Sequence, residues 1–127
     1  MRHFETGATR DSDEDKLDYE GFLSPLVLER YAQYMNKHRV QADGTMRGSD
    51  NWQKGFGEDH YQVCMSSLLR HTMDLWLFHR GFSGRDCIED ALCAILFNTM
   101  AYLQQHLMEA CDDPTRTPVS RIHNTGK

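Results

Sequence analysis

The sequence predicts an all-α protein: three main helices that follow an extended N-terminal arm. Apolar residues recur at helical spacing in three segments, 25–39, 59–80 and 85–110. Glycine-rich stretches separate these segments, and no stretch shows a convincing strand alternation. With 127 residues the chain suits one domain with one modest core. We therefore expect a single helical domain over residues 1–111.

The two ends of the chain differ in composition from the predicted helices. Residues 1–23 are polar, rich in Asp, Glu, Thr and Gly, and show no periodicity. Such a segment cannot bury enough apolar surface to order itself alone. Residues 112–127 are also polar and contain Pro114 and Pro118. We interpret the first segment as an arm and the last as a C-terminal tail.

Charge and cysteine content argue against several classes of protein. The formal charge of −5 makes the chain a poor general binder of nucleic-acid polymers, because such binding rests on neutralising phosphates. A small nucleotide in a local basic pocket is still compatible with it. No apolar run reaches the roughly 18 residues that a membrane span needs. The four cysteines match neither a zinc site nor a disulfide framework, which favours reduced thiols in a cytoplasmic protein.

The first predicted helix begins at Ser24 and Pro25. A serine side chain caps free N–H groups, and proline fits the first helical position, where no hydrogen bond is needed. Aromatic and apolar residues then recur on one face: Val27, Tyr31, Tyr34, Met35 and His38. This spacing indicates an amphipathic helix.

A long connection with four glycines, residues 41–57, follows this helix. In a small domain a loop of this length is usually functional or mobile. Trp52 offers a flat face for a nucleotide base, Lys54 a charge for phosphate, and Asn51 an amide for base or sugar edges. The alternative is that Trp52 fills the core from the loop, with Asp50 or Asn51 as a cap.

The second predicted helix carries a polar stripe. Ser67, Arg70, His71 and Asp74 follow the i, i+3, i+4, i+7 pattern and therefore share one side of the helix. Either the stripe faces water, with an Arg70–Asp74 ion pair worth roughly 0.2–0.5 kcal/mol, or it faces a ligand. In the second case Arg70 binds phosphate, and His71 orients a ligand oxygen or relays a proton.

Three polar residues of the third predicted helix are further candidates. Asn98 requires a partner, because burial of an unpaired amide costs about 1–3 kcal/mol. That partner is a neighbouring helix or subunit, or a ligand. Glu89 and Asp90 stand at the helix start, where the helix dipole stabilises carboxylates. Alternatively they bind Mg²⁺, which prefers oxygen ligands, and Asp74 joins them across the helix pair.

The third helix is also apolar over most of its circumference. The residues concerned are Ile88, Leu92, Ile95, Leu96, Met100, Leu103 and Leu107. Natural proteins usually bury such patches in an interface. We therefore expect a homo-oligomer, a dimer or a tetramer, that completes the helical bundle and places each ligand site near a subunit boundary.

The arm carries Arg10 and Lys16 within a run of mixed charges. Such a run is commonly solvated. In the alternative reading the two side chains clamp phosphates while the arm closes over the polar stripe of its own chain or of a neighbour. The arm would then act as a lid on the ligand site.

Taken together, these stretches resemble the family of the dATP/dGTP diphosphohydrolase N-terminal domain, found largely in bacteriophages and prophages. The resemblance is carried by TGATRDSDEDKLDYEGFLSP at 6–25, LERYAQYMNKHR at 28–39, NWQKG at 51–55, SLLRHTMDLW at 67–76 and EDALCAILFNTMAYL at 89–103. That family is similar to the all-α MazG-like nucleotide pyrophosphohydrolases. It implies a helical oligomer in the host cytoplasm that uses Mg²⁺ to hydrolyse a purine (deoxy)nucleoside triphosphate to monophosphate and pyrophosphate.

The sequence departs from the MazG-like pattern in its carboxylates. EExxE does not occur, and Leu92 stands three residues after Glu89, where the pattern has Asp. One hypothesis is therefore a pyrophosphohydrolase in which Asp74, Glu89 and Asp90 bind Mg²⁺, and His71 and Asp74 are catalytic. The other is a non-catalytic sponge that sequesters (cyclic) nucleotide immune signals in phage counter-defence. A purely structural helical interaction protein would bind no nucleotide.

Overall fold

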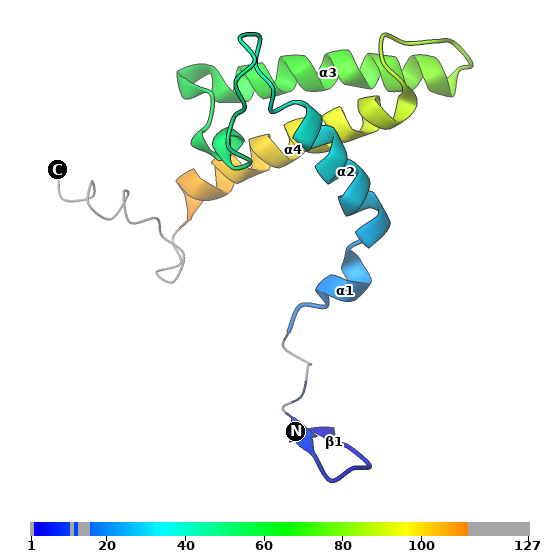
Figure 1. The fold of residues 1–127 in the computed structure, drawn as a ribbon, viewed down its shortest axis with the longest axis vertical. Coiled ribbons are helices and arrows are strands. Elements are labelled where there is room, and N and C mark those ends of the chain that lie inside the picture. The colour runs from blue at the N-terminus through cyan, green and yellow to red at the C-terminus, as the bar shows by residue number, and fades with distance from the viewer. Residues whose placement is uncertain (1, 11, 13–15, 112–127) are drawn as a thin grey trace, which may run out of the picture.

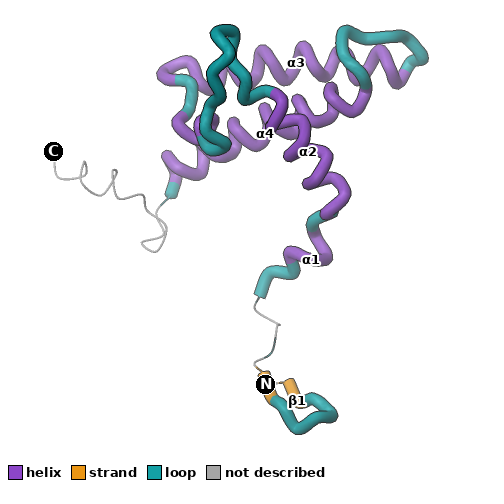
Figure 2. Tube along the Cα trace, in the orientation of Figure 1, coloured by secondary structure: helices purple, strands orange, loops and turns teal. Residues whose placement is uncertain are grey.

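The computed structural model describes residues 2–10, 12 and 16–111. It is mainly helical, which confirms the all-α class (Figures 1 and 2). Its helices are α1 (Tyr19–Phe22), α2 (Pro25–Lys37), α3 (His60–His79) and α4 (Ile88–Ala110), with short 3-10 helices at Asn51–Lys54 and Gly57–Asp59. The predicted tail, residues 112–127, lies outside the described residues.

The helices α3 and α4 form an antiparallel hairpin (Figure 1). Near the start of α3, Nε2 of His60 lies 2.9 Å from the carbonyl oxygen of Ala101 on α4. About two turns further along α3, Oγ of Ser67 accepts a hydrogen bond from Nδ2 of Asn98 on α4 at 3.2 Å. The contacts run in opposite directions along the two helices, because the connection between them is short.

The centre of this hairpin contains small side chains. Its buried apolar residues are Cys64, Ala91, Cys93, Ala94 and Ala101. Side chains of this size allow two helices to approach closely. Three polar residues, His60, Asp74 and Asn98, are buried with them. A polar group at such a position must be hydrogen-bonded, so these residues define where the helices and their connections meet.

The helix α2 begins as predicted. Ser24 is its N-cap, with Oγ accepting a hydrogen bond from the Val27 N–H at 3.3 Å, and Pro25 is its first residue. From its middle and from its last residue, α2 reaches the N-terminus of α4 through ion pairs. Arg30 and Lys37 of α2 contact the carboxylates at the start of α4. Charge therefore contributes to the docking of this helix.

The arm contains structure that the sequence did not predict. Residues Arg2–His3 (β1) and Thr9–Arg10 (β2) pair as antiparallel strands, with Arg2 opposite Arg10. Gly7 in the turn between them has a φ of 89°, a conformation that glycine adopts without strain. Figure 1 shows this hairpin apart from α3 and α4.

Large apolar side chains of α4 are exposed on the chain taken alone. Between 41% and 55% of the surface is accessible at Met100, Leu92, Leu96, Ile88, Leu103 and Leu107. These residues lie three or four positions apart and so form one stripe along the helix. A second exposed set, Met65, Leu69, Met73 and Trp76, follows the same spacing on α3. None of the described helices has the length and apolar character of a membrane span.

Candidate functional site

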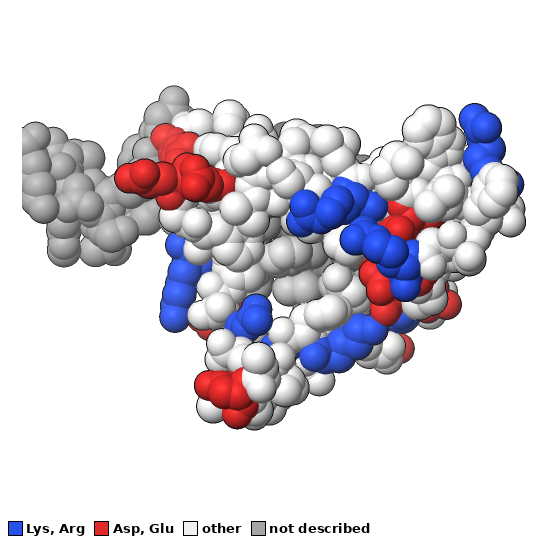
Figure 3. All heavy atoms as spheres, turned by 90° about the horizontal axis from the view of Figure 1, so that it is seen from above, with Lys and Arg blue, Asp and Glu red and all other residues white. Residues whose placement is uncertain are grey.

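A cavity of about 830 Å³ opens between α2, the connection after it, α3 and α4. Small-molecule sites in proteins commonly have volumes of about 300–1,000 Å³. The aromatic part of its wall consists of Tyr31, Tyr34, Trp52, Phe56 and Phe97. Its polar part includes Asn36, His38, Arg39, Arg47, Asn51, Ser67, His71 and Asn98. In Figure 3 the face seen from above is hollowed, and Lys and Arg side chains border the hollow.

Trp52 belongs both to the packing and to the cavity. Its ring meets Phe97 of α4 edge-on, with centroids 6.0 Å apart and an angle of 78° between the planes. The half-buried indole also lines the cavity. Phe56 packs against the same phenylalanine from the other side of the turn, at 6.5 Å. The position of Trp52 is therefore compatible with both interpretations, because its ring packs on α4 and also forms part of the cavity wall.

His60 fixes the end of this connection, and the sequence reasoning missed it. Its Nδ1 accepts a hydrogen bond from the Phe56 N–H at 3.1 Å, and Nε2 donates to the Ala101 carbonyl. The imidazole also stacks on the Phe56 ring, with centroids 5.1 Å apart. One buried side chain thus ties the aromatic segment to α4. The signal in the sequence was the position of His60 at the end of a glycine-rich loop.

Two arginines that the sequence reasoning did not select stand together at the cavity. A β-bridge between Val40 and Met46 closes the intervening turn, and the Arg47 N–H donates to the Arg39 carbonyl at 2.8 Å. Nε of Arg39 donates to the Arg47 carbonyl at 2.8 Å, and Nη1 donates to Oδ1 of Asn36 at 3.2 Å. Backbone pairing therefore brings the two guanidinium groups to the same wall.

Neither Arg39 nor Arg47 forms an ion pair with a carboxylate of the described residues. A guanidinium group presents several N–H donors in a plane and suits the bidentate recognition of phosphate. An anion that enters the cavity would therefore meet two guanidinium groups that form no ion pair with a carboxylate of the described residues, while one carboxylate, that of Glu29, lies on the same wall.

The structure divides the polar stripe of α3. Ser67 and His71 line the cavity, whereas Arg70 is exposed and does not. Asp74 is only 3% exposed and pairs with Arg85 in the connection to α4, with Oδ2 2.8 Å from Nη2. The expected Arg70–Asp74 pair does not form, because Arg85 reaches the carboxylate from the loop. Its hydrogen bonds lower the pKa of Asp74.

Asn98 has the core partners that one reading expected and also lines the cavity. Its Nδ2 donates to the Ala94 carbonyl at 2.9 Å and to Oγ of Ser67 at 3.2 Å. The side chain is buried, at 5% exposure. Its amide therefore joins α3 to α4 at the floor of the cavity.

The three predicted Mg²⁺ ligands do not come together. Arg30 binds Glu89 at 2.6 Å and Asp90 at 2.8 Å, and Lys37 also binds Asp90. These contacts lower the pKa of Asp90, Lys37 first and then Arg30. Both carboxylates are thus engaged in holding α2 on α4, at a distance from Asp74. Among the described residues, the one group of three metal-binding side chains with ligand atoms within 4.8 Å of one another is His71, Asp74 and Asp86.

His71 has an unusual environment. Its side chain is 20% exposed, yet Nδ1 is shielded from solvent and has no hydrogen-bond partner among the described residues. Nδ1 lies 3.9 Å from Oδ2 of Asp74, which is too long for a hydrogen bond. A buried polar atom without a partner costs about 1–3 kcal/mol.

Comparisons with family models, with curated proteins and with solved structures give no match to this chain. The resemblance to the dATP/dGTP diphosphohydrolase N-terminal domain therefore rests on the quoted stretches and stays a prediction.

The remaining predicted phosphate-binding residues lie outside the cavity wall. Arg10 belongs to β2 in the arm, and Lys16 is exposed between the strands and α1. Lys54 ends a 3-10 helix and points to solvent rather than lining the cavity. Within one chain the arm does not cover the cavity, because the hairpin stands apart from the helical body (Figure 1).

Proposed function

We propose that this protein binds a purine nucleotide in the cavity between α2, α3 and α4. The observation that carries the proposal is the combination of an aromatic wall with the two arginines Arg39 and Arg47 in one space of about 830 Å³. A nucleotide needs both, because its base is a flat apolar surface and its phosphates are anionic. Neither feature alone would distinguish a nucleotide from another aromatic or anionic ligand.

The base would lie against Trp52. Stacking on an aromatic ring contributes about 1–3 kcal/mol per base and is tolerant of the base chosen. Asn51 and Asn98 line the same cavity and carry amide groups for polar edges of the base or sugar. The phosphates would lie on Arg39 and Arg47, at the cationic edge of the cavity.

The test is to measure by calorimetry the equilibrium binding of dATP, dGTP and their monophosphates to the full chain. We expect one nucleotide per cavity, and on the order of tenfold or greater loss of affinity in Arg47→Ala and in Trp52→Ala. Arg70→Ala is the matched control, because Arg70 is an exposed arginine outside the cavity. Equal affinity in Arg47→Ala and Arg70→Ala would contradict the proposal.

A second candidate is hydrolysis of the bound triphosphate to monophosphate and pyrophosphate. It is favoured by His71, which lines the cavity with a carboxylate, Asp74, behind it. Arg30 and Lys37 occupy Glu89 and Asp90, so hydrolysis would not use the predicted Mg²⁺ site of Asp74, Glu89 and Asp90. Incubation with dATP or dGTP and Mg²⁺, followed by chromatography, separates the two functions. Pyrophosphate release indicates an enzyme, and intact recovery of the nucleotide, linear or cyclic, indicates a sponge.

We also propose that a second copy of the chain covers the exposed stripe of α4. Six large apolar side chains, at least 41% exposed each, lie on one side of this helix. Each of these side chains is already about half buried, so complete burial of the rest contributes roughly 1 kcal/mol per side chain. A homo-oligomer would cover this stripe. The test is light scattering, in which a mass of at least twice 14.8 kDa is expected.

A further inference from the structure

We propose that His71, Asp74 and Asp86 form a binding site for a divalent transition-metal ion, at the end of α3 beside the cavity. One ligand atom from each side chain lies within 4.8 Å of the other two. An ion at the centre of such a group would approach all three atoms after small side-chain movements, because metal–ligand distances to imidazole and carboxylate are about 2.0–2.2 Å. The proposal does not depend on nucleotide binding.

The second observation is the state of His71. Its Nδ1 is shielded from solvent, lacks a hydrogen-bond partner among the described residues, and faces Asp74 at 3.9 Å. Buried imidazole nitrogens normally have a partner. A metal ion between Nδ1 and the carboxylate would supply one, since the nitrogen lone pair of a neutral imidazole is a common metal ligand.

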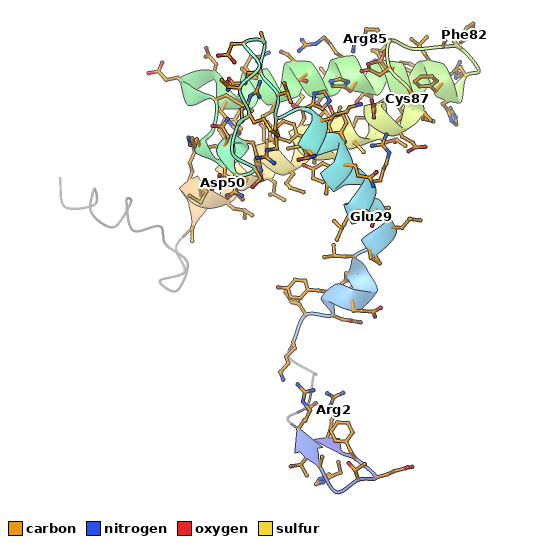
Figure 4. The ribbon with its side chains drawn as sticks, in the orientation of Figure 1. Arg2, Glu29, Asp50, Phe82, Arg85 and Cys87 are labelled. Atoms are coloured by element: carbon orange, nitrogen blue, oxygen red, sulfur yellow. The ribbon has the colours of Figure 1, made fainter. Side chains whose placement is uncertain are left out.

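The backbone of the α3–α4 connection holds the group in place. The Arg85 N–H donates to Oδ1 of Asp74 at 3.2 Å. Gly84 packs so closely on the same residue that an added Cβ would lie 3.2 Å from Asp74 and from Phe78. Close approach at Gly84 therefore places the next acidic residue, Asp86, beside Asp74. Figure 4 shows Arg85 in this connection, above α4.

The guanidinium group of Arg85 forms an ion pair with the Asp74 carboxylate. Its Nε and Nη2 both donate to this carboxylate, at 3.2 and 2.8 Å. The arginine side chain is 57% exposed, so it can leave toward solvent while its backbone N–H stays bound. Metal binding would exchange one positive group for another.

The donor set indicates the class of metal. One imidazole and two carboxylates suit Mn²⁺, Zn²⁺ and similar ions, because nitrogen ligands favour transition metals. Mg²⁺ prefers oxygen ligands and keeps several waters. We therefore expect Mn²⁺ and Zn²⁺ to bind more tightly than Mg²⁺.

The experiment titrates the full chain with Mn²⁺ in the absence of nucleotide, with electron paramagnetic resonance as the readout of free Mn²⁺. We expect saturation at one Mn²⁺ per chain, and affinity lower by on the order of tenfold or more in Asp86→Asn and in His71→Gln. Asp59→Asn, which removes an exposed aspartate outside the group, should bind like the unmodified chain.

Arg85→Ala gives a readout that a merely structural group would not show. Loss of the competing guanidinium should make Mn²⁺ binding tighter. No saturable binding at millimolar Mn²⁺, or equal affinity in Asp86→Asn and the unmodified chain, would overturn the proposal. Nδ1 of His71 would then be a donor to Asp74 after a small rotation of the ring. A thermal melt of each variant checks that it is folded. Loss of Mn²⁺ binding in a folded variant then reflects loss of the site.

Discussion

Three buried polar side chains determine how the two long helices meet. His60 joins the loop to α4, Asp74 accepts hydrogen bonds from Arg85, and Asn98 donates to α3 and to its own helix. Each lies among small residues, where an unpaired polar group would be costly. The specificity of the packing therefore comes from hydrogen bonds as much as from apolar contact.

The first residue-scale prediction concerns Asn98. Asn98→Ala removes donors to Ser67 and Ala94 and should lower the free energy of unfolding by about 1–2 kcal/mol. Chemical denaturation measures the change. Thr99→Ala is the control, because Thr99 is exposed and its hydroxyl bonds only to a carbonyl of its own helix. A cost for Asn98→Ala no greater than that of Thr99→Ala would show that the amide does not join the helices.

The second residue-scale prediction concerns pH. Lys37 and Arg30 lower the pKa of Asp90 in the folded protein below the unfolded value of about 3.9. The ion pairs therefore stabilise the fold above that value, and the contribution is lost as the pH falls through the lowered pKa. We expect Asp90→Asn to lower the melting temperature at pH 7, and the difference from the unmodified chain to shrink at pH 3. A difference that is the same at both pH values would exclude this role.

At the scale of elements, α2 depends on its first turn because few of its residues are covered. Ser24→Ala removes the side chain that accepts from the Val27 N–H and should cost about 0.5–2 kcal/mol. Ser83→Ala is the matched control, since Ser83 is exposed in the connection before α4. Urea denaturation of both variants measures the difference. Equal stability of the two would mean that the cap does not contribute to α2.

The elements also show which parts of the site the sequence can reveal. Ser24, Pro25 and the helical spacing place α2 correctly, because caps and periodicity are local signals. The loop and the two helices likewise supply Asn51, Trp52, His71 and Asn98, all of which line the cavity.

The contacts that the sequence did not predict join residues that no local sequence pattern connects. Arg39 and Arg47 lie side by side because a β-bridge closes the turn between them. No local sequence pattern indicates that bridge. Arg30 and Asp90 are 60 residues apart, so their pairing could not be read from spacing. The three predicted metal ligands lie apart for the same reason, because the carboxylates of Asp74, Glu89 and Asp90 each pair with an arginine or lysine from another segment.

At the scale of the whole molecule, the exposed stripe of α4 predicts assembly. Leu96→Glu places a charge in its middle and should reduce the mass measured by light scattering to that of one chain. Glu109→Gln removes a charge near the end of α4 and should leave the mass unchanged. A mass of 14.8 kDa for the unmodified chain in dilute solution would exclude the oligomer.

The central claim is that a nucleotide base lies on Trp52 in the cavity, and Trp52 itself can report it. The chain has two tryptophans, so Trp76→Phe leaves all indole fluorescence at Trp52. We predict saturable quenching of this variant by dATP or dGTP, and little change in Trp52→Phe, where only the exposed Trp76 emits. Unchanged fluorescence of Trp76→Phe at millimolar nucleotide, with the variant folded, would contradict the claim.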